Sequence, residues 1–205
     1  MTIGILAVQG AFIEHEKMLD MLGINYLEIR QKADLNTPID GLILPGGEST
    51  VQGKLLRELD LFDEIKRQIK EGLPVLATCA GMILLAKDLS NDTKRHFETM
   101  PITVRRNAYG RQLGSFHITS PFKNLGDVPM TFIRAPFVES HLEDVEVLAT
   151  VQGRTVAVRY QNQIALAFHP ELDTDTRIFA YFISIVQQHT HYSKTFSAPH
   201  TAISS

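Results

Sequence analysis

Cys79, the only cysteine of this 205-residue chain, lies where an apolar strand is expected to run directly into an apolar helix. Two small residues, Ala77 and Gly81, flank it two positions before and two positions after, as in the sharp turn that raises a nucleophile above a sheet. The N-terminus of the following helix favours a thiolate over a thiol. A lone cysteine is more often a small buried side chain than a nucleophile. Nucleophilic catalysis is therefore the chemistry to consider, and it depends on the partners that the chain offers.

A thiolate nucleophile needs a histidine to shuttle the proton, and the chain has eight histidines. His169 is the leading candidate because it ends an apolar run and precedes Pro170, which keeps the segment extended. Residues two apart in an extended segment point to the same side, so Glu171 can orient the imidazole of His169. Taken alone, this segment could equally be a turn between a strand and a helix. His117 and His141 remain possible, and the other histidines are expected at the solvated surface: His15, His96, His189, His191 and His200.

A pair of glycines, Gly46 and Gly47, follows another short apolar strand and precedes the start of a helix. Such a turn can direct a backbone N–H into a pocket, as an oxyanion hole requires, although a tight turn is the commoner role of a glycine pair. It is not a phosphate loop, because Gly47 occupies the position of the P-loop lysine. Loops that follow parallel strands share one edge of the sheet. The glycine turn, Cys79 and His169 are therefore expected to converge in one crevice.

The elements that must position these residues alternate in the first half of the chain, as a parallel sheet requires. Apolar spacing and turn residues predict strands over 2–8, 24–29, 41–44 and 74–78, and helices over 12–22, 61–70 and 80–89, with a further helix capped by Ser49 or Thr50.

The second half of the chain is expected to consist mainly of strands, over 102–106, 130–134, 146–151, 155–160 and 163–168. The turn pairs Gln152-Gly153 and Gln161-Asn162 separate the last three strands and indicate antiparallel hairpins. A final helix, capped by Asp173 or Thr174, is predicted to run to about residue 188. The predicted fold class is α/β, a mostly parallel, flavodoxin-like sheet with helices on both faces and an antiparallel extension.

Composition narrows the class of protein further. A hydrophobic content of 44% predicts one compact domain over 1–190, followed by a polar tail over 191–205. A single thiol excludes cysteine-rich zinc sites and suits a reducing compartment. A net charge of −3 offers no basic face for nucleic acid. The apolar run 3–8 is interpreted as a buried strand and not a targeting segment, so we expect a cytoplasmic protein.

Three motifs together resemble the class I (triad) glutamine amidotransferases: Pro45-Gly46-Gly47-Glu48-Ser49-Thr50, Thr78-Cys79-Ala80-Gly81 and Phe168-His169-Pro170-Glu171. Within that class, three further segments are similar to the glutaminase subunits of pyridoxal 5'-phosphate synthase: 4–10, 106–112 and 132–136. The resemblance spans residue 3 to about residue 185. The departures are Ala77 where many relatives have glycine, Tyr109 where phenylalanine is frequent, and a longer tail. None of these removes a functional side chain.

The resemblance implies a role for each residue of the motifs. Cys79 would attack the side-chain amide of glutamine, His169 would protonate the departing ammonia and then activate water, and Glu171 would hold His169. The backbone N–H groups of Gly47 and Ala80 would stabilise the oxyanion. The glutamine pocket would be lined by Gly47, Glu48, Ser49, Arg106, Ile133 and Arg134. Without the resemblance, the two arginines would be interpreted as surface cations.

The resemblance also implies a partner, a barrel-shaped pyridoxal 5'-phosphate synthase subunit that uses the ammonia, and it implies no metal and no cofactor. We hypothesise that docking completes the oxyanion hole, because the glycine turn is flexible. Three alternatives stay open. The chain could serve another acceptor, as the glutaminase subunit of imidazole glycerol phosphate synthase does. It could be a cysteine peptidase or γ-glutamyl hydrolase, or a binding module without activity.

Overall fold

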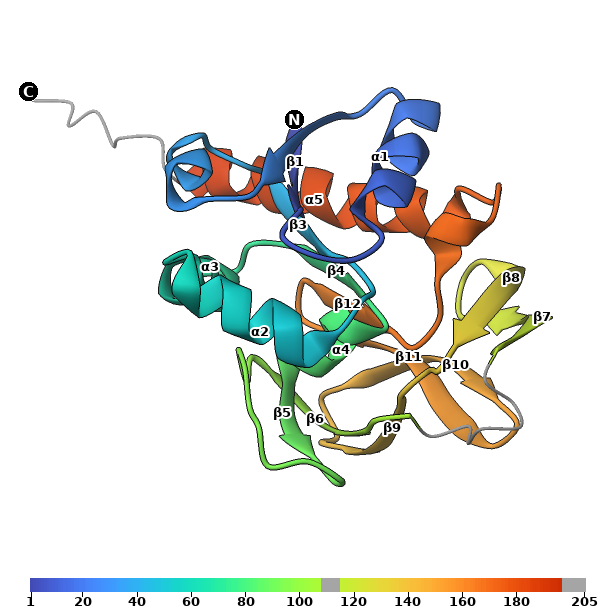
Figure 1. Cartoon of the computed structure of the whole chain (residues 1–205). Coiled ribbons are helices and arrows are strands. Elements are labelled where there is room, and N and C mark those ends of the chain that lie inside the picture. Colours follow the sequence, from blue (N-terminus) through green and yellow to red (C-terminus); the bar gives the residue numbers. More distant parts are fainter. Residues whose placement is uncertain (108–114, 197–205) are drawn as a thin grey trace, which may run out of the picture.

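A ten-stranded mixed sheet forms the centre of the computed structural model, which describes residues 1–107 and 115–196 (Figure 1). Five adjacent strands of it are parallel, in the order β2 (Asn25–Ile29), β1 (Thr2–Leu6), β3 (Gly41–Leu44), β4 (Val75–Thr78) and β12 (Gln163–Leu166). Antiparallel strands continue the sheet from β12 through β11 (Arg154–Tyr160), β9 (Phe137–His141) and β6 (Met100–Arg105), with β5 (Ala86–Leu89) parallel to β6 and β10 (Glu146–Val151) paired with β11.

Helices cover both faces of the parallel strands. Figure 1 shows α1 (Phe12–Met21) and α5 (Arg177–Phe196) on one side and α2 (Ser49–Glu58), α3 (Phe62–Lys70) and α4 (Ala80–Leu85) on the other. The packing of α5 on β3 is close, because a Cβ at Gly41 would lie 2.8 Å from the Val186 side chain. No helix in the described part of the chain is both long and apolar enough to cross a membrane.

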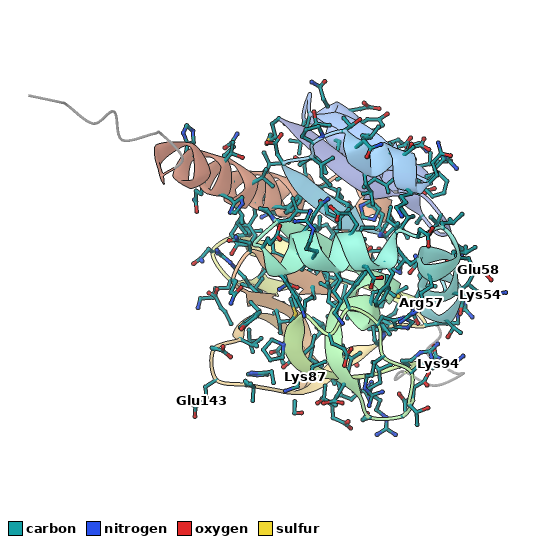
Figure 2. All side chains as sticks on the ribbon, turned by 90° about the vertical axis from the view of Figure 1, so that its left-hand side faces the viewer. Lys54, Arg57, Glu58, Lys87, Lys94 and Glu143 are labelled. Atoms are coloured by element: carbon teal, nitrogen blue, oxygen red, sulfur yellow. The ribbon has the colours of Figure 1, made fainter. Side chains whose placement is uncertain are left out.

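The central strands are apolar throughout because both of their faces are covered. Every residue of β3, β4 and β12 is buried, as expected for parallel strands between two helical layers. Leu44 lies beside Ala77 and Leu166 beside Thr78, so the three strands end almost level. The outer faces of the helices carry charge: Lys54 and Glu58 project from α2 and lie 3.5 Å apart (Figure 2).

A separate two-stranded ribbon, β7 (Ser115–Phe122) and β8 (Gly126–Ile133), packs beside the sheet. Its Phe116 and Phe132 rings stack with their centroids 4.5 Å apart. Phe132 also lies 5.6 Å, between centroids, from the ring of Phe168, which follows β12. The ribbon is therefore fixed against the end of the strand that leads to His169.

Most of the predicted elements are present, and the hairpins β10–β11 and β11–β12 turn at the two predicted positions. The predicted helix over 80–89 is wrong after Leu85, because Ala86–Leu89 instead pairs with β6 as strand β5. Ser49 does not cap α2: Glu48 occupies the N-cap, and its side chain makes no capping hydrogen bond. The strands β7 and β9 and the 3-10 turn η1 (Lys32–Asn36) were not predicted.

The last helix also differs from the prediction. Neither Asp173 nor Thr174 begins it, because Pro170–Leu172 first forms a 3-10 turn, η2, and α5 starts only at Arg177. The helix then continues to Phe196, so the first residues of the predicted polar tail are helical. Tyr109, His200 and the rest of the tail lie outside the described residues.

Candidate active site

Cys79 stands on a strained turn between β4 and α4. Its backbone angles are φ 48° and ψ −98°, in a region that residues other than glycine rarely adopt and that typically marks a functional site. Its backbone N–H donates to the carbonyl of Leu166 over 2.7 Å, which ties the turn to β12. A Cβ at Gly81 would lie 2.1 Å from the carbonyl oxygen of Leu44, so the helix can approach β3 only without a side chain there. The glycine two positions after Cys79 is thus a steric requirement of the turn.

His169 and Glu171 form a buried pair next to Cys79. Nδ1 of His169 lies 2.7 Å from Oε1 of Glu171, and both side chains are almost fully buried. The backbone N–H of His169 donates to the carbonyl of Thr131 in β8 over 2.8 Å, which anchors the segment to the ribbon. Because Nδ1 faces Glu171, Nε2 is the ring nitrogen left for Cys79. The structure therefore brings together the three residues that the sequence motifs singled out.

The electrostatics of this pair favour the charged forms. Burial lowers the pKa of His169, but interactions with the Cys79 and Glu171 side chains outweigh burial and raise this pKa to about 10. Burial raises the pKa of Glu171, but the neighbouring imidazoles of His15 and His169 outweigh it and hold the pKa at about 2. An imidazolium held against an ionised carboxylate is the arrangement expected of a proton-transferring histidine.

Two histidines predicted at the surface are buried. His15 is fully buried on α1, and His96 is packed against Gly53 of α2, where burial lowers the pKa of His96 to about 4. The polar neighbours of His15 concealed its place on the buried face of α1, but its spacing of three and four residues from Met18 and Leu19 indicates that face.

The glycine turn lies directly beside the pair. The N–H of Gly46 donates to Oγ1 of Thr78 over 2.9 Å, and the N–H of Glu48 donates to Oε1 of Gln9 over 2.9 Å. Gln52 Nε2 donates to the carbonyls of Gln9 and Pro45 over 2.9 and 3.1 Å. Gln9 and Gln52, which sequence reasoning did not assign to the site, thus brace the turn from behind. Among the described residues, the N–H of Gly47 has no hydrogen-bond acceptor.

A small cavity of about 40 Å³ opens beside Cys79. Its walls include all six residues that the resemblance assigned to the glutamine pocket: Gly47, Glu48, Ser49, Arg106, Ile133 and Arg134. Two more wall residues, Ile83 and Asn107, were not assigned to the pocket from the sequence. The spacing of four residues from Cys79 to Ile83, one helical turn, was a signal for the first of these two.

The wall of this cavity carries charges of both signs. Arg134 Nη2 lies 3.2 Å from Oε1 of Glu48, and Arg106 pairs with Asp92, which does not line the cavity. Asn107 and Arg134 both have positive φ, 49° and 43°, so the wall is built on strained turns. The wall therefore places a carboxylate and two guanidinium side chains near the thiol.

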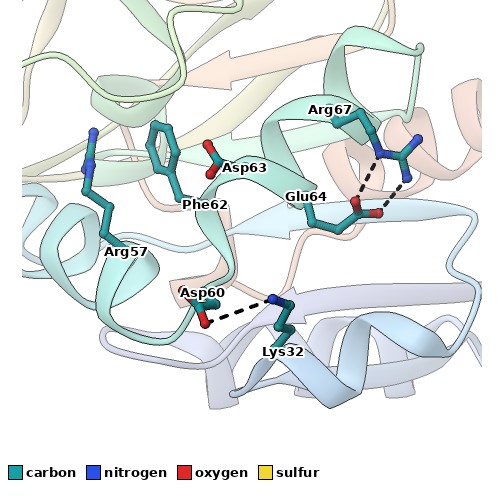
Figure 3. Close-up of a pocket in the computed structure, with 7 residues that line it drawn as sticks. All are labelled: Lys32, Arg57, Asp60, Phe62, Asp63, Glu64 and Arg67. Atoms are coloured by element: carbon teal, nitrogen blue, oxygen red, sulfur yellow. Dashed lines mark hydrogen bonds and ion pairs between the residues drawn. The ribbon is translucent and has the colours of Figure 1, made fainter.

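A larger cavity, of about 570 Å³, lies away from Cys79 between η1, α2 and α3 (Figure 3). Its charged side chains largely satisfy one another: Lys32 lies 3.9 Å from Asp60, and Arg67 lies 2.6 Å from Glu64. Arg57 stacks over the Phe62 ring at 4.0 Å from its centroid. No residue predicted to act in the site lines this cavity, so its size alone does not mark a functional site.

The fold has close relatives among solved structures. A structure described as a glutamine amidotransferase matches with a TM-score of 0.86 and 41% sequence identity, covering 90% of this chain and 98% of that chain. The fold is therefore that of the class I glutamine amidotransferases, as predicted.

Comparison of sequences narrows the class. Two curated relatives described as "Pyridoxal 5'-phosphate synthase subunit PdxT" are 61% identical, from Desulfitobacterium hafniense, and 53% identical, from Methanocorpusculum labreanum. Each match covers 91% of this chain, and 94% and 98% of the respective relative. The model of the SNO glutamine amidotransferase family matches residues 5–188, and the chain belongs to this family. The family resemblance predicted from the motifs is thereby confirmed.

Proposed function

We propose that this chain is the glutaminase subunit of a pyridoxal 5'-phosphate synthase, which hydrolyses L-glutamine to L-glutamate and ammonia for vitamin B6 biosynthesis. The names of the two curated relatives support this assignment. The observation that carries the chemistry is the contact of 2.7 Å between His169 and Glu171 beside the strained turn of Cys79. A cysteine, a histidine and a carboxylate in this order are the parts of a thiol-dependent amide hydrolase.

In the first half of the reaction, the Sγ of Cys79 attacks the side-chain carbonyl carbon of glutamine. The raised pKa of His169 keeps its imidazole protonated at neutral pH, so it can give a proton to the departing nitrogen. A C–S bond forms, the C–N bond breaks, and ammonia leaves behind a glutamyl thioester. The backbone N–H groups of Gly47 and Ala80 stabilise the oxyanion, a contribution whose loss costs roughly 100- to 1,000-fold in rate.

In the second half, water hydrolyses the thioester. His169, which has lost a proton, accepts one from the attacking water, and the C–S bond breaks to release glutamate and restore the thiolate. Glu171 holds Nδ1 of His169 throughout, so that Nε2 stays directed toward the reacting atoms.

The charged wall of the cavity suits the amino-acid end of glutamine. Glu48 offers a carboxylate for the α-ammonium group, and Arg106 and Arg134 offer guanidinium groups for the α-carboxylate. Ser49 adds a hydroxyl to the same wall, and Ile133 adds apolar surface. These side chains would fix the orientation of glutamine while Cys79 reaches its amide.

Ammonia in water at neutral pH is mostly protonated and no longer nucleophilic, so it must pass to the acceptor without escaping. The proposed partner is therefore the barrel-shaped synthase subunit, docked over this site, and a single free thiol suits a cytoplasmic location. The imidazole glycerol phosphate synthase glutaminase is the alternative, and the identity of the partner separates the two.

The test measures ammonia release from L-glutamine by the purified chain, alone and with the pyridoxal synthase subunit. We expect weak hydrolysis alone, faster hydrolysis with the partner, and none above background for Cys79→Ala. Full turnover without any partner would contradict the docking hypothesis, and hydrolysis by Cys79→Ala equal to that of the wild type would refute the proposed function.

A further inference from the structure

One buried polar side chain at this site has no role in the mechanism described above. His15 comes from α1, is 0% exposed, and directs Nε2 at the carboxylate of Glu171, with 3.5 Å between Nε2 and Oε1. The same Nε2 lies 3.3 Å from Oγ1 of Thr78, and that oxygen lies 3.5 Å from the same carboxylate oxygen. On its other side, the imidazole contacts the Phe179 ring of α5, with 5.6 Å between centroids.

The hydrogen-bond partners of His15 favour the tautomer that carries its proton on Nε2, the nitrogen that faces the Glu171 carboxylate. An ionised carboxylate accepts hydrogen bonds and donates none, so the favourable partner at Nε2 is an N–H. The opposite tautomer would bury an N–H at Nδ1, which has no hydrogen-bond partner among the described residues, and would leave a lone pair facing the negative charge. His15 therefore approaches Glu171 as a donor, and hydrogen bonds of this kind often shorten only when substrate is bound.

The contacts of Thr78 extend this network to the glycine turn. Its hydroxyl oxygen accepts the N–H of Gly46 over 2.9 Å and lies within reach of both His15 and Glu171. Three segments of the site thus meet at the buried hydroxyl of Thr78, next to His15. They are the turn after β3, the end of β4 and η2.

We propose that His15 is a positioning residue of this active site: it holds the Glu171 carboxylate in the orientation in which that carboxylate accepts Nδ1–H of His169. The proposal rests on the proposed glutaminase function, because it assigns His15 a part in the same reaction. His15 does not line the cavity, so it acts through Glu171 and not on glutamine.

The interactions of Glu171 with its neighbours support this role. His15 is the strongest of the influences that lower the pKa of Glu171 against the effect of burial, and His169 is the other. The contacts that His15 makes with β4 and α5 are with Thr78 and Phe179, which carry no charge. Loss of the His15 donor must therefore raise the pKa of Glu171 and weaken its hold on His169.

The test replaces His15 by phenylalanine, which keeps a ring against Phe179 but removes the donor. At metal sites, loss of the hydrogen-bond partner behind a functional side chain costs about 10- to 100-fold in affinity or activity, and His15 stands in the same relation to Glu171. We expect a fall of that size in kcat for glutamine hydrolysis in the complex with the synthase subunit, with KM unchanged. The acid limb of the kcat/KM profile should move to higher pH, because Glu171 then protonates at higher pH. His15→Gln, whose amide can again offer an N–H, should recover part of the kcat.

A matched control separates positioning from packing. His96 is also a buried imidazole whose Nδ1 has no partner among the described residues, but it packs against α2 and touches none of the triad. His96→Phe should change thermal stability without moving the pH profile of kcat/KM. If His15→Phe and His96→Phe lose activity only in proportion to their loss of stability, the positioning role is wrong.

A second readout does not depend on glutamine. Cys79 is the only thiol of the chain, so its alkylation by iodoacetamide reports on the state of the Cys79–His169 pair alone. We expect slower alkylation of His15→Phe at neutral pH and partial recovery in His15→Gln. Wild-type protein that releases no ammonia would defeat the proposed function, whereas an active wild type with His15→Phe unchanged in kcat, pH profile and alkylation would overturn only the role of His15.

Discussion

Gly46 lies so close to His169 that adding one methyl group at position 46 should break the contact between His169 and Glu171. A Cβ at this position would lie 2.3 Å from Cε1 and 2.9 Å from Nδ1 of His169, but only in ordinary contact, at 3.5 Å, with the Cβ of Cys79. The backbone of Gly46 is outside the left-handed region, so alanine fits its torsion angles. Gly46→Ala therefore acts through its contact with the imidazole and not through its own torsion angles.

The size of the effect follows from this overlap. Carbon atoms rest about 3.5 to 4.0 Å apart, so the ring must retreat by roughly 1.2 Å or more, or the turn must yield by a similar amount. The hydrogen bond of 2.7 Å to Glu171 cannot survive such a displacement unchanged. A misplacement of about 1 Å costs on the order of 100-fold in rate, and overpacking costs about 1 to 3 kcal/mol of stability.

The assay compares kcat for glutamine hydrolysis with the free energy of unfolding measured in urea. Gly153→Ala is the control, because Gly153 has φ +73° in the β10–β11 turn and no atom within 4 Å of its added Cβ. That variant should lose about 1 kcal/mol of stability through its torsion angle alone and keep its kcat. A kcat for Gly46→Ala equal to that of Gly153→Ala would refute the steric argument.

Three further variants test other parts of the site. Glu171→Gln should lower kcat by roughly 10⁴-fold, because the amide cannot hold the required tautomer. The pKa of Glu171, about 2 against an ordinary 4.5, makes its contribution to stability full above pH 4.5 and lost as the pH falls through 2. The variant should lack this part of the pH dependence in urea unfolding, and an unchanged slope would contradict the assignment. Gly81→Ala should lose about 3 kcal/mol or more in the same assay, because its Cβ meets the Leu44 carbonyl, and wild-type stability would exclude that clash. Arg134→Ala should raise KM for glutamine about tenfold with kcat preserved, and steady-state kinetics showing the reverse would remove Arg134 from the pocket.

The parallel half of the fold could be predicted from sequence because its signals are local. Strands covered on both faces are continuous apolar runs, and small residues follow β3 at Gly46-Gly47 and β4 at Ala80-Gly81. The shared edge of the parallel strands then brings the glycine turn, Cys79 and His169 together without any knowledge of packing. The convergence of these three segments depends only on the parallel direction of the strands, which is why the structure brings them together, whereas the pocket residues came from the family resemblance.

The elements that were missed depend on partners distant in the chain. Ala86–Leu89 continues the apolar pattern of α4, and only its pairing with β6 makes it a strand. In β7 the side chains of alternate residues are more buried, but Pro121 near its end is unusual within a strand. His15 was placed at the surface because its neighbours are charged, whereas the contact with Phe179 of α5 turns it inward. Such contacts are decided by tertiary packing.

The reacting residues and the residues that line the cavity are held in different ways. Cys79 and His169 follow strands buried in the sheet, and the Gly46 N–H is already bound to Thr78, so their spacing is fixed by strand register. The cavity wall instead includes Asn107 and Arg134, which have positive φ and lie in turns outside the parallel strands. Changes to the wall should therefore appear mainly in KM, and changes that reach the imidazole mainly in kcat.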